Sequence, residues 1–149
     1  MSLTHWTHQN FSEMSWHDNH VHALRIVEGP HGAGELILDL DYILEWIREP
    51  DGYKFRILPV ALRFIEVTDL RVALDYATPT AALGPFSIHS IERRTVPRER
   101  YAAEIWKISI NWPKGEITFE AKGYEQQATG TAVVSKSQCL HPAERNHRA

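Results

Sequence analysis

Apolar and polar residues alternate between residues 35 and 46, and this alternation constrains the fold more than any other feature. The even positions hold only large apolar side chains: Leu36, Leu38, Leu40, Tyr42, Leu44 and Trp46. The odd positions hold four acids and two isoleucines: Glu35, Ile37, Asp39, Asp41, Ile43 and Glu45. Because successive side chains of a strand point to opposite faces, this pattern predicts a half-buried β-strand with a polar outer face.

A second strand is predicted at residues 20–27, before the turn-forming segment Gly29-Pro30-His31-Gly32-Ala33-Gly34. Two strands joined by a short glycine-rich loop are typical of an antiparallel hairpin. Matching the apolar faces pairs Leu24 with Leu38 and Ile26 with Leu36. A slip of one residue would turn one apolar face to water, so the register is strongly specified.

This register separates two groups of reactive side chains. It directs His20 and His22 toward the core and leaves Asp39 and Asp41 on the outer face. If the extended conformation reaches back to residue 18, Asp18 shares a face with both histidines. We therefore expect the imidazoles and the two strand carboxylates to belong to different sites.

Further short strands follow along the chain. In residues 53–67 the apolar parity changes between Ile57 and Val60, which predicts either a bulge at Pro59 or two strands broken there. Alternation in 106–112 and 117–121, around Pro113-Lys114-Gly115, predicts a second hairpin. About eight short strands, with no amphipathic helix longer than two turns, predict an all-β antiparallel sandwich or partly open barrel.

The domain organisation follows from the same pattern. Residues 1–134 are expected to form one β-rich domain, and the polar residues 135–149 a flexible C-terminal tail. Residues 1–13 fit either a short helix or an arm that packs its aromatic side chains on the sheet.

Composition excludes several classes of protein. The net charge of −3 gives no electrostatic reason to expect nucleic acid, and no apolar run is long enough to span a bilayer. The single cysteine, Cys139, excludes an internal disulfide and any multi-cysteine zinc site. A cytoplasmic location is the default expectation, and the sequence leaves a homo-oligomer open.

Asp18, His20 and His22 form the candidate metal site. Three protein ligands with an open position are the usual arrangement around catalytic zinc, and His-x-His on a strand offers two nitrogens on one face. Trp16 precedes this set and would line its pocket. The competing structural interpretation is that the histidines lie half-buried at the start of a strand and hydrogen-bond to neighbouring groups.

The acidic outer face of residues 35–45 is the second candidate site. Its carboxylates are balanced by Arg25 and Arg56 across the sheet if they are only a solvated surface. If the face has a function, the best candidate is the binding of a basic partner protein. The residues expected to bind a partner or ligand are Trp16, His17, Asp39 and Asp41.

The segment Trp16-His17-Asp18-Asn19-His20-Val21-His22, followed by a strand with Leu38-Asp39-Leu40, also carries a resemblance. It resembles small bacterial β-rich domains whose first strand opens with a Trp/Phe-His-Asp-x-x-Val/Ile motif, some of which are similar to immunity proteins of polymorphic toxin systems. The resemblance covers about the first third of the chain. It implies a protein-binding role without catalytic residues, and it matches His17 and Asp18 as residues that cap the start of the sheet.

Three functions therefore remain. The favoured one is a non-enzymatic interaction domain that uses its acidic sheet face, and the resemblance implies that it is immunity-like. The second is a metal-binding protein or metal-dependent enzyme that uses Asp18, His20 and His22, with zinc as the representative divalent ion. The third is a small-ligand-binding barrel, which a large apolar cavity would indicate.

Overall fold

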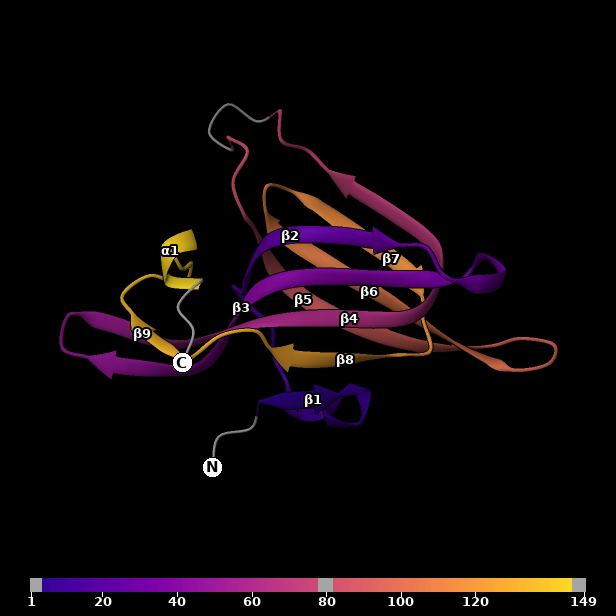
Figure 1. Cartoon of the computed structure of the whole chain (residues 1–149), viewed down its shortest axis with the longest axis horizontal. Coiled ribbons are helices and arrows are strands. Elements are labelled where there is room, and N and C mark those ends of the chain that lie inside the picture. The colour runs from indigo at the N-terminus through magenta and orange to yellow at the C-terminus, as the bar shows by residue number, and fades with distance from the viewer. Residues whose placement is uncertain (1–3, 78–81, 146–149) are drawn as a thin grey trace.

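The computed structural model describes residues 4–77 and 82–145, and within them the chain is almost entirely β-structure (Figure 1). Three short helical segments accompany the strands: η1 (His8–Glu13), η2 (Pro30–Gly32) and α1 (Pro142–Arg145). The nine described strands are β1 (His5–Thr7), β2 (His20–Val27), β3 (Gly34–Glu49), β4 (Gly52–Leu74), β5 (Phe86–Pro97), β6 (Ala102–Trp112), β7 (Gly115–Glu120), β8 (Gly123–Ala128) and β9 (Val133–Ser135). The predicted all-β class is confirmed.

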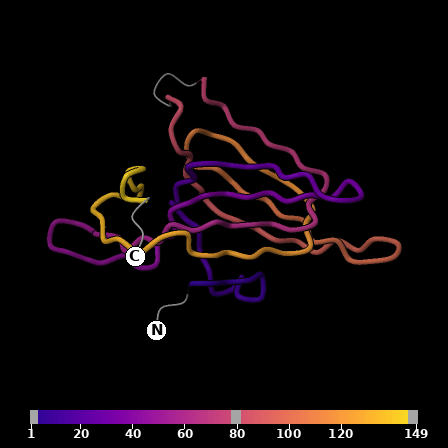
Figure 2. The backbone as a smooth tube through the Cα atoms, viewed as in Figure 1, coloured from indigo at the N-terminus to yellow at the C-terminus, as the bar shows by residue number. Residues whose placement is uncertain are grey.

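All strand pairs are antiparallel, and the main path through the sheet is β1-β8-β4-β3-β2-β5-β6-β7. β7 also pairs with the far half of β4, so the sheet curls back on itself (Figure 2). Only two residue pairs join β2 to β5, which leaves the curled sheet open beside β2. Of the two expected architectures, this one is closer to the partly open barrel. No helix in the described parts of the chain has the length and apolar character needed to cross a bilayer.

The N-terminal segment combines both expected arrangements. β1 pairs with β8, which places Trp6 in the core. The short 3-10 helix η1 brings Phe11 against the rings of Trp16 and Trp106. Thr7 caps η1 through its side chain. Residues 4–13 are thus an arm that covers one side of the curled sheet.

The predicted hairpin register is confirmed in the half of the hairpin nearest its loop. Leu24 lies opposite Leu38 and Ile26 opposite Leu36. The second predicted hairpin is also present, as β6 and β7, with Ile108 opposite Ile117.

The prediction that His20 and His22 face the core is wrong. The register of β2 against β3 shifts between Val21 and Ala23, so β2 contains a bulge at His22. A bulge adds one residue to one strand and reverses the parity of everything beyond it. Val21 therefore occupies the core, and both histidines share the outer face with Asp41, which lies directly opposite His20.

The prediction of a bulge or break at Pro59 is also wrong, because β4 runs through Pro59 without a register shift. The parity change instead marks two different cores: Phe55 and Ile57 pack in the outer-face core, whereas the even-numbered residues from Leu58 to Phe64 pack in the inner core. The Pro59 carbonyl accepts a hydrogen bond from the Thr129 amide, beyond the end of β8. The nitrogen and the carbonyl of a strand residue point to the same side. The Pro59 nitrogen, which has no hydrogen to donate, therefore faces the gap between β8 and β9.

The main core lies inside the curled sheet. Its largest fully buried side chains are Leu36, Leu38, Leu40, Leu62, Phe64, Ile88, Trp106, Ile108, Ile117, Phe119 and Tyr124. A second, smaller core sits on the outer face, where Leu140 packs against Ile43, Phe55 and Ile57.

The C-terminal segment differs from the flexible tail expected after residue 134. Residues 136–145 fold back over the outer face of β3 and β4, where Leu140 is only 1% exposed. The segment is polar overall, but it is docked by the buried side chain of Leu140 and by the ion pair of Arg145 with Asp41. Residues 146–149 lie outside the described residues.

Leu140 is expected to contribute measurably to stability through this second core. Replacing Leu140 with alanine should lower the free energy of unfolding by about 2–3 kcal/mol, since it removes a buried leucine and leaves a cavity. Urea denaturation followed by tryptophan fluorescence measures the change. Leu83→Ala is the matched control, because Leu83 is 91% exposed and its truncation should change stability by less than about 0.5 kcal/mol. Equal effects of the two substitutions would contradict the docked position of the segment.

Candidate functional site

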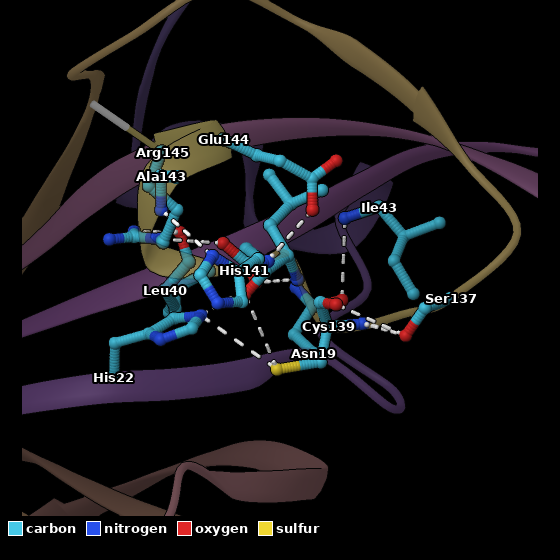
Figure 3. A network of polar contacts seen from close by, with 12 residues as sticks. Asn19, His22, Leu40, Ile43, Ser137, Cys139, His141, Ala143, Glu144 and Arg145 are labelled. Atoms are coloured by element: carbon cyan, nitrogen blue, oxygen red, sulfur yellow. Dashed lines mark hydrogen bonds and ion pairs between the residues drawn. The ribbon is translucent and has the colours of Figure 1, made fainter. Parts of the chain in front are cut away.

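The densest polar cluster lies on the outer face of the sheet, around Asp41. This carboxylate is fully buried, and it receives hydrogen bonds from Arg145 Nε to Oδ1 (2.8 Å) and from the Leu140 amide to Oδ2 (2.8 Å). His22 Nε2 lies 2.8 Å from the same Oδ2, and Cys139 Sγ lies 3.9 Å from His22 Nε2 (Figure 3). His22 from β2 and two residues of the C-terminal segment thus contact one carboxylate of β3, and Cys139 lies against His22.

Three local features of the sequence bring these groups together. The bulge in β2 turns His22 toward β3, and the alternation in β3 points Asp41 outward. The C-terminal segment is shaped by its own short-range bonds, with Glu144 accepting from the His141 amide (2.9 Å). Arg145 also donates from Nη2 to the Leu40 carbonyl (3.1 Å), which ties α1 to the backbone of β3.

Burial and hydrogen bonding oppose each other at Asp41. Burial raises the pKa of the Asp41 carboxyl, but the bonds from His22, Arg145 and the Leu140 amide outweigh it, so the pKa lies below its ordinary value. The carboxylate is therefore ionised at neutral pH, and the Arg145 guanidinium compensates its charge. Burial lowers the pKa of His20, which favours a neutral imidazole beside the cluster.

Cys139, His22 and Asp41 do not form a nucleophilic relay. In such a relay the imidazole uses one ring nitrogen for the nucleophile and the other for the carboxylate. Here Nε2 of His22 faces both partners. In addition, burial and the nearby Asp41 charge raise the pKa of the Cys139 thiol to about 11, so it is protonated at neutral pH. The cluster is a clasp that holds the C-terminal segment on the sheet.

A pocket of about 670 Å³ opens beside the clasp. Figure 1 shows the far end of β4 diverging from β2, and the pocket is lined from both strands, from residues 83–86 and from the C-terminal segment. Its apolar lining residues include Val21, Leu24, Leu74, Leu83, Pro85 and Phe86. Polar groups gather on one side, where His22, Cys139, His141 and Glu144 contribute to the wall.

The predicted metal ligands Asp18, His20 and His22 do not form a cluster of ligand atoms within 4.8 Å of one another. Asp18 accepts hydrogen bonds from Asn111 Nδ2 (2.9 Å) and Gln138 Nε2 (3.3 Å). His17 lies beside it, with Nε2 3.5 Å from Asp18 Oδ2. The proposed role of the pair in capping the start of the sheet stays a prediction.

The other predicted binding residues are also separated. Trp16 is buried in the main core and lines none of the described pockets; its Nε1 donates to Gln126 Oε1 (2.8 Å). Asp39 stays near the surface, 3.8 Å from Arg25 as the register predicts, whereas Asp41 is buried. The expected acidic face therefore loses its central carboxylate to the clasp.

Sequence reasoning missed Cys139 and Arg145 because it assigned them to a flexible tail. The one available signal was Cys139-Leu140, an apolar pair inside an otherwise polar segment. Comparison of the chain with models of known protein families found no match, and comparison with curated proteins found no significant relative. The site must therefore be interpreted from its own geometry.

Proposed function

We propose that this chain is a binding domain that holds a small, mostly apolar molecule in the pocket beside β2. The pocket volume of about 670 Å³ carries the proposal. Small-molecule sites typically measure about 300–1,000 Å³, have mainly apolar walls with a few converging polar groups, and often lie at the mouth of a curled sheet.

The distribution of side chains predicts how such a molecule lies. Leu24, Leu74 and Phe86 supply apolar walls, which favour an aliphatic or aromatic body. His22 and Glu144 lie among the polar lining residues, on the clasp side, where they offer hydrogen bonds to a polar end group. The ligand class that fits is a small amphiphile whose polar end points toward the C-terminal segment.

Partner binding through the acidic face is less well supported. Asp41 is buried, and Glu35 forms an ion pair with Arg63 (2.9 Å). Asp39 likewise lies 3.8 Å from Arg25, and such pairs are expected for a solvated sheet face. The similarity to immunity proteins stays a prediction, which co-purification of a stoichiometric partner from the native host would test.

Binding of an apolar probe tests the proposal. An environment-sensitive naphthylamine dye and a fluorescent medium-chain fatty acid should each bind saturably, at one site per chain. Leu83→Glu should weaken this binding about tenfold or more, because a charge replaces an apolar contact at the pocket rim and each 1.4 kcal/mol is tenfold.

Val134→Glu is the matched control, since Val134 is also exposed but lines none of the described pockets. It should bind both probes as the wild type does. Absence of saturable binding to either probe, or equal weakening by the two substitutions, would refute the assignment of the pocket.

A further inference from the structure

Three side chains of different ligand types converge at the clasp. His22 Nε2, Asp41 Oδ2 and Cys139 Sγ all lie within 4.8 Å of one another, and in the described residues no other group of three His, Cys, Asp or Glu side chains does so. They come from β2, β3 and the C-terminal segment, so only the fold brings them together. We propose that they form a site for a zinc-like divalent ion.

The separations of the ligand atoms differ by no more than about 0.6 Å from those of tetrahedral coordination. Zinc bonds of about 2.0–2.3 Å require nitrogen–oxygen and nitrogen–sulfur separations of about 3.4 and 3.6 Å. The corresponding distances are 2.8 Å between His22 and Asp41 and 3.9 Å between His22 and Cys139. Small rotations of the side chains therefore suffice to seat an ion between them.

The surroundings of Asp41 match those of a ligating carboxylate. Oδ1 accepts a hydrogen bond from Arg145 Nε, and Oδ2, which also accepts from the Leu140 amide, faces His22. Hydrogen bonds of this kind orient metal ligands and are a regular part of metal sites. One thiolate, one imidazole and one carboxylate also favour zinc over magnesium or calcium, which prefer oxygen ligands alone.

The fourth coordination position faces the pocket. His22 and Cys139 both line the pocket wall, so a water molecule or a donor atom of a bound molecule reaches the ion from that side. On binding, the ion takes the place of the thiol proton of Cys139, which passes to solvent, and the sulfur bonds as thiolate. The site does not depend on the proposed apolar ligand.

Cobalt and zinc titration tests the site. Protein purified without an affinity tag and stripped with a chelator should bind one Co²⁺ per chain with a thiolate-to-cobalt charge-transfer band in the near ultraviolet. Zn²⁺ should displace the cobalt and remove the band. Cys139→Ser should abolish the band, and His22→Gln should weaken zinc binding about tenfold or more.

His141→Gln is the matched control, because His141 lines the same pocket but lies outside the ligand set. It should keep the band and the zinc affinity, and circular dichroism should show all three variants folded. Absence of the band in the wild-type protein, or its persistence in Cys139→Ser, would overturn the proposal. So would equal losses of zinc affinity in the two histidine variants. Binding of the apolar dye is measured on the metal-free protein. Failure of the metal site and failure of the pocket proposal can therefore be told apart.

Discussion

Replacing Asp41 with alanine is expected to lower the free energy of unfolding of the metal-free protein by about 3–5 kcal/mol, the range for breaking a buried ion pair. The substitution leaves the Arg145 guanidinium and the Leu140 amide without their buried acceptor. An uncompensated buried charge costs more than the lost bond itself. The C-terminal segment should detach as a consequence, which would also expose the second core around Ile43.

Asp39→Ala is the matched control, two residues away on the same strand. Asp39 is partly exposed and its contact with Arg25 measures 3.8 Å, so its loss should cost less than about 1 kcal/mol. Urea denaturation in the presence of a chelator compares the two variants. If Asp41→Ala proves as mild as Asp39→Ala, Asp41 is not the buried centre of the clasp.

This pair of variants also probes the point at which sequence reasoning failed. Alternation of apolar residues correctly predicts the strand, the antiparallel hairpin and the pairs Leu24–Leu38 and Ile26–Leu36. The pattern fails on the N-terminal side of Ala23, because the bulge at His22 is not marked by a glycine, a proline or any other local signal in the sequence. One inserted residue then moves both histidines to the face of Asp41.

The second failure has a different physical origin. A strand covered on both faces contains apolar residues of both parities, and one sequence does not say what covers the second face. Phe55 and Ile57 are covered by Leu140, more than 80 residues further along the chain. The parity change at Pro59 therefore reflects the docking of the C-terminal segment and not the proline. Without knowledge of that long-range contact, the clasp cannot be predicted from the sequence.

The tryptophans lead to the second large prediction. Parity places Trp46 on the inner face, and the position of Trp16 beside the histidines predicts that it lines a pocket. The structure reverses them: Trp46 is 46% exposed and Trp16 only 3%. Trp16→Ala should lower the free energy of unfolding by about 3–5 kcal/mol, as for other buried aromatic residues cut back to alanine. The lost indole packs against Tyr124 at 5.6 Å between ring centroids and against Phe11 at 5.9 Å.

A buried hydrogen bond adds to this cost. Trp16 Nε1 donates to Gln126 Oε1 at 2.8 Å, and Gln126 is fully buried. Trp16→Phe should therefore still destabilise the protein, by about 1–3 kcal/mol, because Gln126 Oε1 loses its donor while most of the packing remains. Thermal and urea denaturation of the two variants separate the packing contribution from the hydrogen bond.

Trp46→Ala is the comparison that decides the assignment. Trp46 contacts the rings of Phe55 and Tyr53, at 5.0 and 5.8 Å between centroids, on a half-exposed surface. Its loss should cost only about 1–2 kcal/mol, in line with one or two exposed aromatic contacts. If Trp46→Ala destabilises the protein more than Trp16→Ala does, Trp46 faces the core as the parity of the sequence predicts. That result would contradict the bulge in β3, between Ile43 and Glu45, that turns Trp46 outward.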